Sequence, residues 1–145
     1  TILLDDKDVS SLIRSKEITN AVSEVSALQP VREKIVKIQK DITENGNFVI
    51  EGRDIGTVIY PGAKYKFFLI ADYDTRAERR LKDFKRLNEE LNVNKIKQDL
   101  IDRDQYDSSR KLSPLKQASD AIVIDTSNCT FDDQVNQIYK HIERN

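Results

Sequence analysis

The sequence has few of the residues that cross-link or anchor a protein chain. Its 145 residues include one cysteine, Cys129, so an intrachain disulfide is excluded, and a single free thiol fits a reducing cytosol. No histidine is close to it in sequence, which gives a nucleophilic role little support. No apolar run approaches the ~20 residues that cross a membrane, and no charged-then-apolar leader is present. We therefore expect a cytoplasmic protein without a membrane partner.

Metal ligands, phosphate loops and net charge are also scarce. The single histidine, His141, is interpreted as structural, and no Cys/His spacing is typical of a zinc site, so no metal ligand is predicted in this chain. No loop of the Gly-x-x-x-x-Gly-Lys-Ser/Thr type occurs. The net charge is −1, and acidic residues interleave with the basic ones, so no nucleic-acid partner is predicted. Any anion site must come from local arginine clusters.

The sequence is rich in helical patterns. Apolar spacing predicts helices over 17–28, over 30–44 before Asn45-Gly46, and after Thr130, where Asp133 completes a helix-start pattern. The apolar face of the last helix is predicted at Phe131, Val135, Ile138 and Ile142. A longer helical stretch, with a break near Asn92, has its apolar stripe at Ala77, Leu81, Phe84, Leu87, Leu91, Val93, Ile96 and Leu100.

Short apolar runs lie between these helices. They predict buried strands at 48–50, 66–71 and 121–125. Strands of this kind, separated by helices, favour the α/β class with a parallel sheet covered on both faces. Such a sheet binds ligands at the carboxyl ends of its strands, which directs attention to the residues that follow each strand.

The turn after the first predicted strand reads Gly52-Arg53-Asp54-Ile55-Gly56-Thr57. Two glycines four residues apart let a ligand approach the backbone closely. An arginine beside an aspartate offers a phosphate fork and a hydrogen-bond acceptor in adjacent positions. A turn with a surface ion pair explains the same residues equally well.

A second cluster lies on the long helical stretch. Arg103, Asp107 and Arg110 are spaced i, i+4 and i+7, so they share one face if the helix persists. Two arginines that flank a carboxylate could grip a phosphate and a sugar hydroxyl. A solvated helix face with ion pairs is the competing interpretation, and it is the more common one for charge runs.

The remaining candidates are less distinctive. Arg76 and Arg80 lie one helical turn apart just after a strand, where arginine can stack on a base or neutralise phosphate charge. A polar helix face is again the more common explanation. Ser23 and Arg32 belong to the first two helices, and by pattern alone both would be taken as surface residues.

Taken in order, these segments resemble the cytidylate kinase family. The likeness covers nearly the whole chain at family-like spacing, through 22–27, 30–32, 52–58, 76–80, 103–107, 113–115 and 120–126. Any one segment is weak evidence, but the ordered set is specific. The resemblance implies a P-loop nucleoside monophosphate kinase-like parallel sheet with flanking helices. It also implies transfer of the γ-phosphoryl group of ATP to CMP or dCMP, with Mg²⁺.

The resemblance further implies a role for each candidate residue. Cytosine would be read by Ser23, Arg32 and Asp54. Its exocyclic amine would donate to the hydroxyl and the carboxylate, and its acceptors would be satisfied by the arginine. The monophosphate would be held by Arg53 and Arg110, and the sugar–phosphate region by Arg103 and Asp107. The catalytic residues would be Arg103 and Arg110, and those that face ATP would be Arg76 and Arg80.

Against the family pattern, the N-terminal strand and the P-loop are missing. Residues 1–15 would be the end of the monophosphate-binding insert, 16–75 and 111–145 the core, and 76–110 the lid and flanking helices. The chain opens at Thr1, and we expect a longer parent polypeptide, a monomer, and no kinase activity from these 145 residues alone. Two alternatives stay open: a non-catalytic pyrimidine-nucleotide-binding module, and a UMP or AMP kinase. Uracil has a carbonyl where cytosine has an amine, so a carboxylate at Asp54 would repel it.

Overall fold

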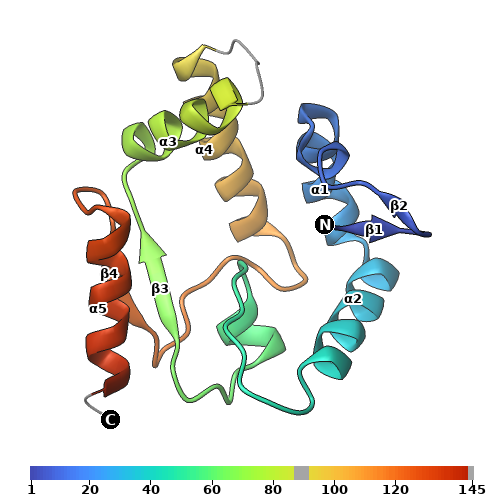
Figure 1. The fold of residues 1–145 in the computed structure, drawn as a ribbon, viewed down its shortest axis with the longest axis vertical. Helices are drawn as coiled ribbons and strands as arrows, with labels where there is room; N and C mark the ends of the chain where they lie inside the picture. Colours follow the sequence, from blue (N-terminus) through green and yellow to red (C-terminus); the bar gives the residue numbers. More distant parts are fainter. Residues whose placement is uncertain (87–91, 144–145) are drawn as a thin grey trace. The chain divides into compact units, whose positions relative to one another are not determined.

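The computed structural model of the chain describes residues 1–86 and 92–143. It divides into two compact units, Thr1–Val49 and Ile50–Asn145, whose elements are drawn in Figure 1. Most of the described residues are helical, and the two sheets have two strands each. The class is therefore mixed α/β, as the sequence predicts. No helix among these described residues is both long enough and apolar enough to cross a membrane.

The first unit begins with a small antiparallel hairpin of β1 (Leu3–Leu4) and β2 (Lys7–Asp8). The two turn residues, Asp5 and Asp6, have φ of 48° and 63°. A two-residue turn with positive φ at both positions matches the right-handed twist of the strands that it joins. The hairpin is thus closed by local backbone geometry.

Two helices complete the first unit. Helix α1 (Lys16–Ala27) is capped by Ser15, whose side chain accepts from the Ile18 amide, and α2 (Gln29–Ile42) has Pro30 in its first turn. Both predicted helices are confirmed, although α2 ends at Ile42, earlier than the Asn45-Gly46 stop. Its last turn is closed by the amide of Thr43, which donates to the carbonyls of Gln39 and Lys40.

The predicted strand at 48–50 is wrong. These residues form no strand, and the side chains of Phe48 and Val49 are 49% and 104% exposed. A strand requires a neighbour that completes its backbone hydrogen bonds, and in the described residues this segment has none. The segment instead connects the two units.

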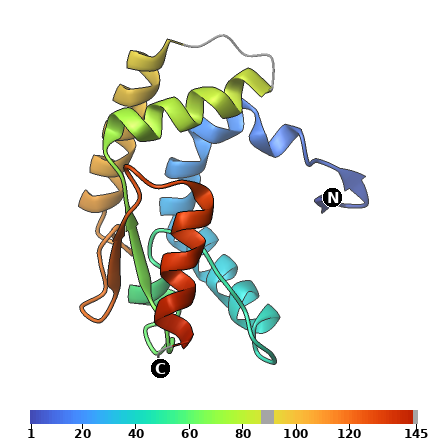
Figure 2. The same ribbon diagram turned by 60° about the vertical axis from the view of Figure 1, so that its left-hand side comes forward.

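The second unit contains a two-stranded parallel sheet. Strands β3 (Phe67–Ile70) and β4 (Ile122–Asp125) confirm the other two predicted strands. Helix α5 (Phe131–Glu143) lies beside the sheet in both ribbon views (Figure 2), and the rings of His141 and Phe67 are 6.2 Å apart. The expectation of a sheet covered on both faces is wrong for these two strands alone, because large exposed fractions remain at Leu69, Ile70 and Val123.

Helices α3 (Tyr73–Arg86) and α4 (Val93–Ser109) form the main apolar core of the second unit. The break predicted near Asn92 is confirmed, because the Asn92 side chain caps α4 by accepting from the Asn94 amide. The core residues are Ala77, Phe84 and Ile96, with Leu81 and Leu100 against them. Leu87 and Leu91, predicted on the same stripe, lie outside the described residues. Helix α3 follows β3 directly, so this core holds α3 at the carboxyl end of that strand (Figure 1).

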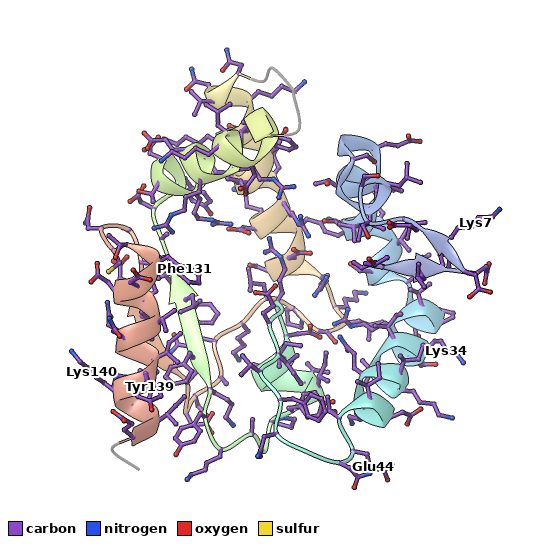
Figure 3. The ribbon with its side chains drawn as sticks, in the orientation of Figure 1. Lys7, Lys34, Glu44, Phe131, Tyr139 and Lys140 are labelled. Carbon is purple, nitrogen blue, oxygen red and sulfur yellow. The ribbon has the colours of Figure 1, made fainter. Side chains whose placement is uncertain are left out.

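The start of α5 follows its predicted pattern, whereas of its predicted apolar face only Ile138 is half-buried. The Thr130 amide donates to the Asp133 carboxylate at 3.1 Å, and the Asp133 amide donates to the Thr130 hydroxyl at 3.2 Å. Phe131 and Tyr139, labelled in Figure 3, are 77% and 57% exposed. The half-buried side of α5 is instead formed by Gln134, Gln137, Ile138 and His141.

Candidate anion-binding site

The site begins in the loop that carries Arg53 and Asp54. A π-helical turn, Ile55–Ile59, follows these residues, and the Asp54 carbonyl accepts from the Val58 amide at 2.9 Å. Turns of this kind are rare and often occur at functional sites. Asp54 is buried and Arg53 is half-buried, so the loop holds two adjacent charged side chains away from bulk water.

Helix α4 supplies the second part of the site, and it persists far enough to keep the predicted face. It runs to Ser109, with Arg110 as its C-terminal cap. The side chain of Asp107 is 2% exposed, and Arg110 Nη1 and Arg103 Nε lie 3.1 Å and 3.8 Å from its two oxygens. The structure therefore brings together the three residues that the spacing predicted.

Arg53 joins the loop to the helix. Its Nη1 lies 2.8 Å from Asp104 Oδ1, and its Nε lies 2.9 Å from Asp107 Oδ2. Asp104 and Asp107 are three residues apart on α4 and present their carboxylates on one side. One guanidinium is thus held by two carboxylates from another element.

Helix α3 adds a further arginine. Arg76 Nη1 lies 2.5 Å from Asp104 Oδ2, and its Nη2 lies 3.3 Å from Asp104 Oδ1. Arg80, one turn further on, places its guanidinium carbon 4.8 Å from the centre of the Phe84 ring. Arg76 and Arg80 therefore differ: Arg76 is part of the ion-pair cluster, whereas Arg80 stacks on an aromatic ring of the α3–α4 core.

Among the described residues, the ion pairs of this cluster contain more guanidinium groups than carboxylates. Four guanidinium groups, from Arg53, Arg76, Arg103 and Arg110, surround the carboxylates of Asp104 and Asp107. Burial and the nearby charge of Arg53 lower the pKa of Arg103 below the ordinary arginine value. An excess of half-buried positive charge favours the binding of an anion.

The contact between Asp104 and Arg76 also shifts the pKa values of these two groups. Burial by itself would raise the pKa of Asp104, but hydrogen bonds from Arg76 and Arg53 outweigh it, so the pKa lies below the usual aspartate value. The hydrogen bond to Asp104 raises the pKa of Arg76. Both groups are therefore held in their charged forms.

Two buried polar atoms in the cluster lack hydrogen bonds. Arg103 Nε and Asp107 Oδ2 are buried, and neither makes a hydrogen bond within residues 1–86 and 92–143. Arg53 Nε approaches the same oxygen as an ion pair. Buried donors and acceptors without partners are rare in native proteins, and a bound ligand can supply the partner that such atoms need.

Ser23 and Arg32 belong to the first unit. Arg32 Nη1 donates to the Ser26 carbonyl at 3.1 Å, and the Ser26 hydroxyl donates to the Ser23 carbonyl at 3.1 Å. Both predicted base-reading residues are half-buried at the junction of α1 and α2. That they share one pocket with Asp54 stays a prediction.

Two charged residues near the site were not singled out by sequence reasoning. Asp104 could have been found by extending the face of Asp107 to the i, i+3 position. Arg79 donates to the hydroxyl and the carbonyl of buried Thr126 at 3.1 Å and 2.5 Å, and so ties α3 to the residue after β4. Nothing local in the sequence indicates this contact, because it joins residues 47 positions apart.

The described side chains include no cluster of metal ligands. Within residues 1–86 and 92–143, no group of three or more His, Cys, Asp or Glu side chains could hold a metal ion. The two carboxylates of the cluster are both engaged by arginines.

The parallel strands and the helices around them define the chain as an α/β protein, and its half-buried arginines near the carboxyl end of β3 form a candidate anion-binding site. A sequence profile of the cytidylate kinase family matches residues 1–144. Cytidylate kinases of Fusobacterium nucleatum and Protochlamydia amoebophila are 45% and 46% identical over 141 and 142 residues, which cover 97% and 95% of this chain. One from Clostridium botulinum is 43% identical over 99% of it. The chain belongs to the cytidylate kinase family.

The match extends over only part of each relative. The chain spans 65%, 62% and 66% of the lengths of these three proteins. The family assignment therefore rests on the shared segment, and the activity of the whole protein is a separate question.

Proposed function

We propose that this chain forms the acceptor-binding part of a kinase that transfers the γ-phosphoryl group of ATP to CMP or dCMP. One observation carries the proposal: among the described residues, Arg103 Nε is buried without a hydrogen bond, inside a cluster of arginines around Asp107. A nucleoside monophosphate combines what such a place requires. It carries a dianionic phosphate for the guanidinium groups and sugar hydroxyls for the carboxylate.

The phosphate of the acceptor would be held by Arg53 and Arg110. Arg53 is fixed by two carboxylates, and Arg110 is fixed by Asp107 and by the Ser113 carbonyl, to which its Nε donates at 2.7 Å. Fixed guanidinium planes bind phosphate oxygens with little further loss of conformational entropy. A sugar hydroxyl would donate to the carboxylate of Asp107.

The base would be read by Ser23, Arg32 and Asp54. A carboxylate and a hydroxyl accept from the exocyclic amine of cytosine, and an arginine donates to its ring acceptors. The burial of Asp54 supports this role, because a buried carboxylate discriminates strongly between a donor and an acceptor on the base.

ATP, the phosphoryl donor, would be contacted by Arg76 and Arg80. Arg103 and Arg110 would lie next to the transferred phosphoryl group. Phosphoryl transfer depends mainly on in-line positioning and on cations near the developing charge. The excess positive charge of the cluster supports this use. ATP follows from the kinase family, whereas Mg²⁺, a monomeric state and a cytoplasmic location stay predictions.

The fold of the whole protein would be of the P-loop nucleoside monophosphate kinase type. In that arrangement β3 and β4 belong to a larger parallel sheet. The half-exposed side chains of Leu69, Ile70 and Val123 support the proposal, since further strands and helices would cover them.

The direct test is CMP-dependent formation of ADP by the intact natural polypeptide that carries this chain. Arg53→Gln should reduce kcat/KM for CMP at least about 100-fold, the loss expected for a charge-assisted phosphate contact. Lys97→Gln removes a positive charge from the same helix as Asp104, where the amine pairs with exposed Asp74 at 2.6 Å, so it serves as the control. Nucleotide binding without turnover would instead favour the non-catalytic module. Equal rates with CMP, UMP and AMP would contradict the base assignment.

A further inference from the structure

Asp104 occupies a place in the site that none of the proposed substrate contacts uses. Its side chain is 14% exposed, on α4, and its oxygens lie 2.8 Å from Arg53 Nη1 and 2.5 Å from Arg76 Nη1. The two arginines come from different elements, the loop before the π-helical turn and the first turns of α3. Asp104 therefore joins three segments that local sequence does not hold together.

Both arginines meet on one oxygen. Asp104 Oδ1 accepts from Arg53 Nη1 at 2.8 Å and from Arg76 Nη2 at 3.3 Å. Two guanidinium groups at this separation repel each other, and partial burial strengthens the repulsion because the local dielectric constant is low. The carboxylate between them is what allows the two cations to lie together.

The same contact orients Arg53. Asp104 takes its Nη1 and Asp107 takes its Nε, so the plane of the guanidinium is fixed from one side. Within residues 1–86 and 92–143, no acceptor is found for its Nη2. An arginine binds a phosphate well only when its planar fork is aimed before the ligand arrives.

We propose that Asp104 is a positioning residue, which aims Arg53 at the acceptor phosphate and holds Arg76 beside it. This inference rests on the proposed function, because it assigns Arg53 to the phosphate of CMP. Asp104 contacts neither nucleotide and acts only through the two arginines. Its loss should therefore weaken acceptor binding more than it weakens the fold.

The test compares Asp104→Asn with the wild type in the intact polypeptide, by steady-state kinetics and by calorimetric titration with CMP. Asp104→Asn keeps the shape of the side chain but removes its charge. We expect KM and Kd for CMP to rise about tenfold, since Arg53 then has to be ordered by the ligand itself. Asp104→Glu, which keeps the charge, should recover part of the loss.

Two controls separate positioning from a general structural effect. Asp102→Asn makes the same change on the exposed side of α4, where the carboxylate accepts from Gln98, and should leave KM for CMP unchanged. In an Arg53→Gln background, Asp104→Asn should raise KM for CMP by less than a further factor of about two, because the residue through which Asp104 acts is already gone.

The outcomes are distinguishable. A wild type that neither binds nor phosphorylates CMP contradicts the proposed function, and the inference with it. A wild type that does both, while Asp104→Asn matches its KM and Kd, contradicts the inference alone. The inference is also contradicted if the losses from Asp104→Asn and Arg53→Gln are simply additive, because Asp104 would then act independently of Arg53.

Discussion

Lys66 shows how one side chain sets the position of the loop that carries Arg53 and Asp54. Its side chain is 8% exposed, forms an ion pair with Asp120 at 2.6 Å and donates to the Pro61 carbonyl. It passes so close to Gly56 that a Cβ there would lie 3.2 Å from Lys66 Cδ. The glycine thus allows a buried cation to lie directly against the loop backbone.

Gly56→Ala should therefore destabilise the protein. The new methyl group would crowd the stem of Lys66 and approach the Ala118 side chain at 3.7 Å, and overpacking of this kind costs about 1–3 kcal/mol. Urea denaturation would measure the loss. Gly62→Ala is the matched control, because nothing in the described structure lies within 4 Å of the added atom there, and a loss at Gly62 equal to that at Gly56 would refute the packing argument.

Among the secondary-structure elements, the pair α3–α4 connects packing to the site. Its apolar core of Ala77, Phe84 and Ile96 fixes the two helices, and their polar faces carry Arg76 and Asp104. The distances within the ion-pair cluster depend on how these helices are held. A change in the core should therefore alter the distances between the arginines and aspartates of the cluster.

Phe84→Ala should lower the free energy of unfolding by about 3–5 kcal/mol, since it removes a 7% exposed ring from the centre of this core. Binding of CMP should also weaken, because α3 and α4 no longer hold their charged faces in register. Phe131→Ala truncates a ring that is 77% exposed on α5, and its effect should stay within about 0.5 kcal/mol. If urea denaturation gave similar losses of unfolding free energy for Phe84→Ala and Phe131→Ala, the assignment of Phe84 to the core would be contradicted.

Across the complete chain, the carboxylates determine how stability responds to acid. The pKa is lowered at six described aspartates, by hydrogen bonds from side chains or amides, and these are Asp8, Asp72, Asp104, Asp120, Asp125 and Asp133. A carboxylate with a lowered pKa in the folded state binds protons less readily there than in the unfolded chain. Its contribution to stability is present above the unfolded pKa and is lost as the pH falls through the folded pKa.

The free energy of unfolding should therefore fall as the pH is lowered from about 5 to about 3, the range that begins just above the unfolded aspartate pKa. Urea denaturation at a series of pH values would measure the slope. Asp104→Asn should make this slope shallower, because one of the contributing carboxylates is gone. A free energy of unfolding that stays constant down to about pH 3 would contradict the lowered pKa values of these aspartates.

The sequence pattern predicts an element correctly where the residues that determine the element are close together in sequence. The strands at 67–70 and 122–125, the break at Asn92 and the start of α5 depend on apolar runs and caps that are close in sequence, and each is predicted correctly. The spacing of Arg103, Asp107 and Arg110 likewise predicts one face, because a helix turns those positions together. The ordered motifs of the chain were also enough to indicate its family.

Contacts between distant segments could be learned only from the folded chain. Residues 48–50 are not a strand, since an apolar run cannot supply its own neighbour for backbone hydrogen bonds. The ion pair of Arg53 with Asp104 joins residues 51 positions apart, and that of Arg76 with Asp104 joins residues 28 apart. No periodicity carries such pairings, because they depend on how helices and loops pack in space, and the electrostatics of this site follow from that packing.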